Sequence, residues 1–76
     1  MKKFLKYLIT SIVKYQDYVS IKEAEEGDYL NLIIKVHPKD IKTVIGKNGL
    51  TIKSIRELVK IKAFKKGKRI NIKIEE

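Results

Sequence analysis

The segment Val44–Ile52 constrains the fold more than any other part of the chain, because two glycines interrupt an otherwise helical pattern. Gly46 and Gly49 enclose Lys47 and Asn48, and the apolar residues on either side keep helical spacing. This arrangement predicts a helix, a tight loop and a second helix. Glycine permits a positive φ and a close approach to the main chain, which suits contact with a sugar-phosphate backbone, and Lys47 adds positive charge. A lone Gly-x-x-Gly is equally typical of ordinary helix ends, so the loop alone does not decide its function.

The N-terminal segment predicts an amphipathic helix. Its apolar residues recur in adjacent pairs at helical spacing, and they are Phe4, Leu5, Leu8, Ile9, Ile12 and Val13. Lys6 and Lys14 bound the apolar run and no small-residue cleavage site follows, so we do not expect a signal peptide. A domain this small needs its apolar residues for its own core, which favours packing over a position on a membrane surface. No stretch of the sequence is apolar for long enough to span a bilayer.

After Asp17 the apolar spacing changes to a period of two, which predicts a β-hairpin with one buried face. The turn is expected at Glu25–Asp28, and the alternating residues are Val19, Ile21, Leu30, Leu32, Ile34 and Val36. His37 and Pro38 end the second strand, because the residue before a proline disfavours the helical region. Two helices and a strand follow. The short helix is marked by Ile41, Val44 and Ile45, the longer helix by Ile52, Ile55, Leu58, Val59 and Phe64, and the strand by Ile70, Ile72 and Ile74. The predicted order is helix, strand, strand, helix, helix, strand.

Positive charge is concentrated in the second half of the chain. Residues 1–34 carry five lysines and five acids, whereas residues 35–76 carry thirteen Lys or Arg and four acids, so the net charge of +9 lies wholly in the half with the glycine loop. A basic balance is typical of proteins that bind nucleic acid or anionic membranes. The length of 76 residues with a single proline indicates one small domain, and the absence of cysteine excludes a disulfide framework.

The string from Val44 to Arg56, VIGKNGLTIKSIR, closely resembles the signature of a KH domain. It has the aliphatic pair, the Gly-x-x-Gly loop, and isoleucines three and six positions after the second glycine. The predicted element order is similar to the type II form of that domain, and the whole chain resembles the KhpA-like group of small stand-alone bacterial KH proteins. The resemblance implies an α+β fold with a single type II KH domain over residues 1–76. Its three-stranded mixed sheet would be covered on one face by three helices, and the last strand would run parallel to the strand ending at Val36.

The resemblance also implies low-specificity binding of single-stranded RNA, with the glycine loop clamping roughly four unpaired nucleotides. The helix beginning near Leu50 would present its positive end to a phosphate. Bases would lie in a shallow groove with Ile41, Val44, Ile45 and Ile52 as candidate walls. The predicted nucleic-acid-binding residues are Lys42, Ile45, Gly46, Lys47, Asn48, Gly49, Ile52, Lys53 and Arg56. A secondary set, Lys65, Lys66, Lys68 and Arg69, occupies the position of the variable loop, expected across the groove from the glycine loop.

The resemblance points to a cytoplasmic RNA chaperone or post-transcriptional regulator, and the residue inventory argues against an enzyme. Asn48 stands where a phosphate-binding P-loop needs Ser or Thr, and Ile41 replaces its first glycine. His37 has no second His or Cys with which to share a metal. We therefore expect no catalytic residue, no metal and no cofactor.

Two alternatives stay open. The chain could act as an assembly or adaptor module, as a homodimer or as a heterodimer with a second KH-type protein, since the KhpA-like group is expected to pair in this way. It could also bind single-stranded DNA, because a backbone clamp discriminates poorly without contacts to the 2′-hydroxyl.

Overall fold

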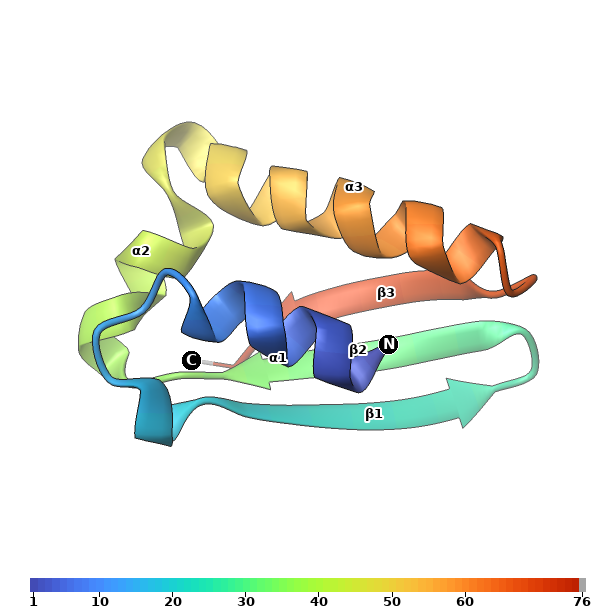
Figure 1. Cartoon of the computed structure of the whole chain (residues 1–76), viewed down its shortest axis with the longest axis horizontal. Helices are drawn as coiled ribbons and strands as arrows, with labels where there is room; N and C mark the ends of the chain where they lie inside the picture. Colours follow the sequence, from blue (N-terminus) through green and yellow to red (C-terminus); the bar gives the residue numbers. More distant parts are fainter. Residues whose placement is uncertain (76) are drawn as a thin grey trace.

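The computed structural model describes residues 1–75, and within them three helices and three strands follow one another in the predicted order (Figure 1). The main elements are α1 (Lys2–Thr10), β1 (Ser20–Glu26), β2 (Tyr29–Lys35), α2 (Ile41–Ile45), α3 (Leu50–Phe64) and β3 (Arg69–Ile74). Short 3-10 turns precede β1, α2 and α3, and they are η1 (Gln16–Tyr18), η2 (Pro38–Asp40) and η3 (Lys47–Gly49). The predicted α+β fold is therefore confirmed.

The sheet is mixed, and β2 is its central strand. β1 pairs with β2 in the antiparallel sense and β3 pairs with β2 in the parallel sense. The parallel register sets Leu32 opposite Ile72, and because side chains alternate along a strand, both point to the same face. Parallel neighbours need a long crossover, which α2 and α3 provide. The prediction that the last strand runs parallel to the strand ending at Val36 is confirmed.

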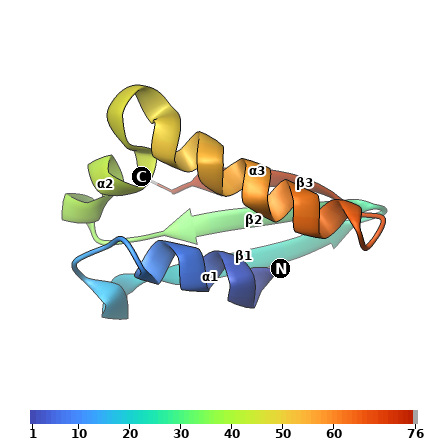
Figure 2. The ribbon, with the colours of Figure 1, turned by 45° about the horizontal axis from the view of Figure 1, so that its top comes forward.

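The core lies between one face of this sheet and the helices. Figure 2 shows α1 and α3 over the same face, with α2 beyond the end of β2. The largest fully buried side chains come from both layers, and they are Leu5, Ile9, Leu32, Ile34, Val44 and Val59. Burying each such aliphatic side chain stabilises the fold by about 1.5–3 kcal/mol. The helix-free face of the sheet carries the other set of alternating residues, including Tyr29, Asn31 and Asn71.

Two element boundaries differ from the sequence prediction. The first helix ends at Thr10 rather than continuing to Val13, and the Ile12 N–H donates to the Ile9 carbonyl in a 3-10-type bond (3.1 Å). The hydroxyls of Thr10 and Ser11 donate to the carbonyls of Lys6 (2.9 Å) and Tyr7 (2.7 Å), and such local side-chain bonds are slightly unfavourable to a continuing helix. Val13 nevertheless remains buried in the core.

The hairpin turn is also shorter than predicted. β1 extends through Glu26, which pairs with Tyr29, so the turn consists of Gly27 and Asp28 alone. Gly27 has a φ of 62°, as the first position of a two-residue hairpin turn often requires. Glu25 therefore belongs to a strand rather than to a turn.

The third helix forms where the apolar spacing predicts it, but not all of its apolar residues are buried. Ile52, Ile55 and Val59 enter the core, whereas Leu58 is 48% exposed and Phe64 is 80% exposed. Among residues 1–75, no helix is both long enough and apolar enough to cross a membrane.

Candidate nucleic-acid interface

The loop between α2 and α3 reverses the chain within four residues, Gly46 to Gly49. The Gly46 N–H ends α2 by donating to the Lys42 carbonyl (2.8 Å), and the Gly49 N–H donates back to the Gly46 carbonyl (3.1 Å). Three of the four residues have a positive φ: Gly46 at 78°, Asn48 at 57° and Gly49 at 72°. Asparagine tolerates this left-handed region better than most residues, so each residue type suits its position.

Gly46 has a second constraint besides its dihedral angles. A Cβ built on Gly46 would overlap the Thr51 side chain and lie 2.8 Å from the Thr51 backbone nitrogen. At Gly49 the same construction meets nothing within 4 Å. Gly46 is therefore required by close packing against the start of α3, whereas Gly49 faces open space from which a ligand can approach.

The loop is held to the rest of the fold through a buried aspartate that precedes α2. Asp40 is only 3% exposed, and its two carboxylate oxygens accept hydrogen bonds from the backbone N–H groups of Lys14 (3.1 Å) and Tyr15 (2.9 Å). His37 adds a local bond, because its Nδ1 accepts from the Lys39 N–H (3.1 Å). The segment after α1 is thus tied to the start of the helix pair that carries the loop.

Exposed cations surround the loop. Lys42, Lys47 and Lys53 are exposed, and no side chain caps the N-terminus of α3. The first-turn N–H groups of a helix carry partial positive charge, which favours an anion at this end. Arg56 lies further along α3 and donates through Nη2 to the Ile72 carbonyl of β3 (3.4 Å). Lys42 and Lys53 are thus exposed within four residues of the loop in the sequence, Lys47 is exposed within it, and Arg56 lies at the edge of the sheet.

The four candidate groove walls divide into two pairs. Ile41 and Ile45 are half-buried and keep part of their surface open, whereas Val44 and Ile52 are 0% and 7% exposed and belong to the core. Val44 and Ile52 therefore support the loop from beneath and offer little surface to a ligand.

The basic run between α3 and β3 lies at the far end of α3 from the glycine loop (Figure 1). The fifteen residues of α3 separate the two by roughly 22 Å. Lys65 and Lys66 are exposed in this connection, and Lys68 forms an ion pair with Glu25 (Nζ to Oε2, 3.4 Å). The run thus lies at the opposite end of α3 rather than in a position directly facing the glycine loop.

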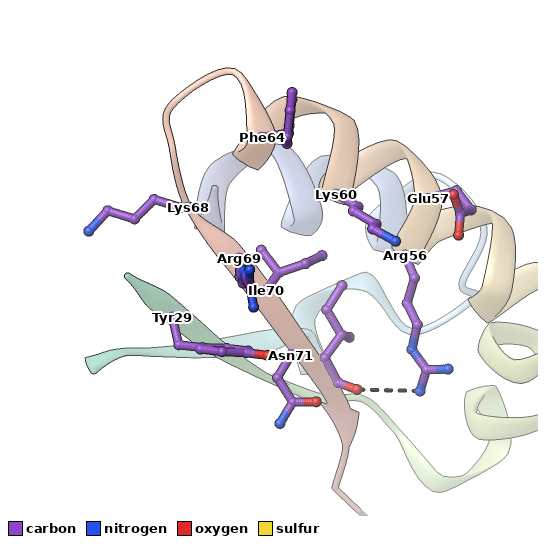
Figure 3. A pocket seen from close by; sticks show the side chains of 10 residues that line it. Tyr29, Arg56, Glu57, Lys60, Phe64, Lys68, Arg69, Ile70 and Asn71 are labelled. Carbon is purple, nitrogen blue, oxygen red and sulfur yellow. Dashed lines mark hydrogen bonds between the residues drawn. The ribbon is translucent and has the colours of Figure 1, made fainter. Parts of the chain in front are cut away.

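A groove of about 680 Å³ connects this region with the middle of α3. Figure 3 shows its walls, which come from α3 on one side and from the start of β3 on the other. The lining residues are Tyr29, Arg56, Glu57, Lys60, Phe64, Lys68, Arg69, Ile70, Asn71 and Ile72. Of these lining residues, Arg56, Lys68 and Arg69 were among the predicted binding residues and the other seven were not. The period-two pattern puts Tyr29 on the helix-free face, but only the strand register brings it beside Arg69.

The chain has a glycine loop with positive φ between two helices, and these helices connect strands of a mixed three-stranded sheet. In this element order, the arrangement is that of a type II KH domain. A family model described as "KhpA/KhpB, KH domain" matches residues 2–74. The chain therefore belongs to the KhpA/KhpB family of KH domains.

Curated relatives match over nearly their full length. The chain is 34% identical to the RNA-binding protein KhpA of Halalkalibacterium halodurans, over 97% of this chain and 97% of the relative. It is 36% identical to RNA-binding protein KhpA of Clostridium acetobutylicum, over 97% of this chain and 99% of that protein. It is 37% identical to RNA-binding protein KhpA of Chlamydia pneumoniae, over 100% of this chain and 97% of that protein. No solved structure matches the chain significantly.

Proposed function

We propose that this protein binds short segments of single-stranded RNA through the loop Gly46–Gly49, with low sequence specificity. The observation that carries the proposal is the shape of the loop: a main chain with positive φ at Gly46, Asn48 and Gly49, open to approach at Gly49 and next to the exposed Lys47. The names of the curated relatives, RNA-binding protein KhpA, support RNA as the ligand.

In this proposal the loop binds the sugar-phosphate backbone, and the apolar surface of α2 next to the loop receives the bases. Lys47 neutralises a phosphate, and the uncapped first turn of α3 donates backbone N–H groups to another. Ile41 and Ile45 offer apolar surface to the bases, while Lys42, Lys53 and Arg56 add cations along the path of the strand. Contacts with the RNA backbone and with apolar surface depend little on which bases are present, and this accounts for the low specificity.

The double variant Lys47→Asp/Asn48→Asp tests the loop. Aspartate tolerates the left-handed conformation of residue 48, and residue 47 is exposed, so the fold should be retained. We expect fluorescence anisotropy with short unstructured RNAs to show binding by the wild type and a loss of at least about tenfold in the variant.

A control variant, Lys3→Asp/Gln16→Asp, makes the same change in net charge at two exposed positions outside the loop. Equal losses in both variants would mean that only total charge matters, and the loop would not be the binding site. If three to five cations neutralise phosphates in the wild type, the slope of log affinity against log salt should be roughly −2 to −3.5.

We further propose that residues 1–76 form one KH domain that has no catalytic activity and acts in the cytoplasm as an RNA chaperone or post-transcriptional regulator. A competition experiment between RNA and single-stranded DNA of the same sequence tests which of the two nucleic acids the protein prefers. A preference for DNA would replace RNA as the proposed ligand without changing the role of the loop.

A second candidate function, pairing with another KH-type chain, is supported by an exposed apolar face on α3. Its four large side chains are Leu50 (59% exposed), Leu58 (48%), Ile61 (57%) and Phe64 (80%). The helical spacing puts them on the side of α3 that faces away from the core residues Ile55 and Val59. Several large apolar side chains exposed on one side of a helix are typical of an interaction surface.

The variant Leu58→Glu tests this face by placing a charge within it. We expect sedimentation equilibrium at micromolar concentration to show self-association of the wild type and a monomeric Leu58→Glu variant. Tyr7→Ser, which alters a 68% exposed side chain on α1, serves as the control and should leave self-association unchanged. A wild type that stays monomeric at all concentrations would rule out the homodimer.

A further inference from the structure

The groove between α3 and β3 lies well away from the glycine loop. Lys60 lies eleven residues after Gly49, so roughly 16 Å of helix separates it from the loop. A Gly-x-x-Gly loop clamps about four nucleotides, and this groove offers additional surface past that length. Arg56 lies between the loop and Lys60 along α3 and lines the near end of the groove.

The groove is strongly basic on both walls. Arg56 and Lys60 lie one turn apart on α3, and Figure 3 shows the Arg56 side chain reaching toward the Ile72 carbonyl of β3. Lys68 and Arg69 supply positive charge from the strand side. Glu57 is the one acid among the lining residues, so the groove attracts an anionic ligand.

An aromatic ring and an amide stand next to these cations. Tyr29 is 43% exposed, and the strand register sets it opposite Arg69 on the helix-free face of the sheet. Figure 3 shows its ring beside Asn71, whose amide nitrogen donates to the Asn31 side-chain oxygen (3.3 Å). Phe64 lines the groove from the end of α3, and Tyr29 is the aromatic ring on the strand side, next to the start of β3. Exposed aromatic rings flanked by cations are typical platforms for unpaired bases.

The β3 edge favours a nucleotide over an acidic peptide. An extended peptide would bind there by adding a strand to β3, which needs free backbone groups along the edge. The Ile72 carbonyl already accepts the hydrogen bond from Arg56 (3.4 Å), so an added strand would compete with this contact. A base stacked on Tyr29 needs no such ladder of backbone bonds.

We propose that the start of β3 forms a second RNA subsite, in which Tyr29 stacks on a base of the strand that leaves the glycine loop while Lys60 and Arg69 neutralise its phosphates. This inference rests on the proposed RNA binding by the loop. It assigns a longer footprint than the roughly four nucleotides that the loop accounts for.

The test compares RNAs of about four and about nine nucleotides on the wild type and on Tyr29→Thr. Threonine keeps a high strand propensity but removes the ring, so the sheet should be retained. We expect Tyr29→Thr to weaken binding of the longer RNA about tenfold and to leave binding of the shorter RNA within about twofold. Tyr7→Thr, at an exposed tyrosine of α1, should change neither affinity.

A second measurement on the wild type does not depend on any variant. Backbone amide NMR shifts should change only near Gly46–Lys53 with the shorter RNA, and additionally at Tyr29, Lys60 and Asn71 with the longer one. Unchanged shifts at these three residues, or equal effects of Tyr29→Thr on both RNAs, would overturn the second subsite. A wild type that binds neither RNA would instead overturn the proposed function itself, and the second subsite with it.

Discussion

The two ends of α3 carry turns that look alike in sequence and differ in structure. Both contain glycine and lysine: Gly46-Lys47-Asn48-Gly49 before the helix and Lys65-Lys66-Gly67-Lys68 after it. The second turn is a helix stop, because the Lys68 N–H donates to the Ala63 carbonyl and the Gly67 N–H donates to the Phe64 carbonyl, both at 3.0 Å. This is the pattern of a Schellman motif, in which glycine supplies the left-handed residue.

The two turns differ in why each glycine cannot readily be replaced by a residue with a Cβ. A Cβ on Gly67 would meet nothing within 4 Å, so only its φ of 70° disfavours other residues. A Cβ on Gly46 would in addition overlap Thr51 of α3. Glycine and lysine in a turn therefore do not by themselves indicate a ligand-binding loop. Close packing of the backbone against the next helix distinguishes the first turn from the second.

Replacing each glycine by alanine should give the largest contrast between the two turns. We expect Gly46→Ala to lower the free energy of unfolding by about 3 kcal/mol, because positive-φ strain adds to the clash with Thr51. Gly67→Ala should lower it by about 1 kcal/mol, since only the left-handed φ is unfavourable. Urea unfolding followed by circular dichroism measures both values. Equal losses would show that Thr51 moves aside and that Gly46 is no more constrained than a helix cap.

The two ends also differ in how they are held to the rest of the fold. The glycine-loop end depends on buried Asp40, whereas the other end has the surface ion pair between Lys68 and Glu25. We expect Asp40→Ala to lower the free energy of unfolding by about 2–3 kcal/mol, because the N–H groups of Lys14 and Tyr15 lose their acceptors. Asp17→Ala, at an exposed aspartate, should change it by less than about 0.5 kcal/mol.

Thermal unfolding of the Asp40 and Asp17 variants provides the measurement. Asp40→Asn keeps one acceptor and should fall between the wild type and Asp40→Ala. A loss below about 0.5 kcal/mol for Asp40→Ala would mean that the two N–H groups find water instead, and that the carboxylate does not hold this end.

Sequence periodicity was sufficient to predict the element order, and the two glycines marked the loop, whereas the parallel pairing of the outer strand was predicted from the resemblance to KH domains. It could not predict which apolar residues of α3 are buried. Residues Ile52 to Phe64 include apolar positions around more than half of the helix, and only the placement of the sheet decides that Val59 is inside while Leu58 is outside. The exposed face of α3 therefore became visible only in the folded chain.

The distal groove and the buried aspartate were missed for a similar reason. Tyr29 and Asn71 are more than forty residues apart in the sequence, and the strand register alone brings them together. Asp40 before a helix reads as an ordinary cap, but its side chain makes no cap bond and instead accepts from residues on the segment after α1. Contacts between distant segments leave no periodic signal in the sequence.

The smallest expected effect concerns the ion pair at the distal end. Lys68 and Glu25 have side chains that are 31% and 59% exposed, so their attraction is screened and Glu25→Gln should change the free energy of unfolding by less than about 0.5 kcal/mol. The same change releases the Lys68 ammonium for a phosphate in the groove, and we expect binding of an RNA of about nine nucleotides to tighten about twofold. Glu23→Gln, on the same strand, changes the net charge equally and should have a smaller effect. Anisotropy titrations at low salt resolve this difference. If both variants tighten binding equally, Lys68 acts only through the overall charge and makes no specific contact with a phosphate. The two ends of α3 would then differ in backbone packing but not in how their lysines contribute to RNA binding.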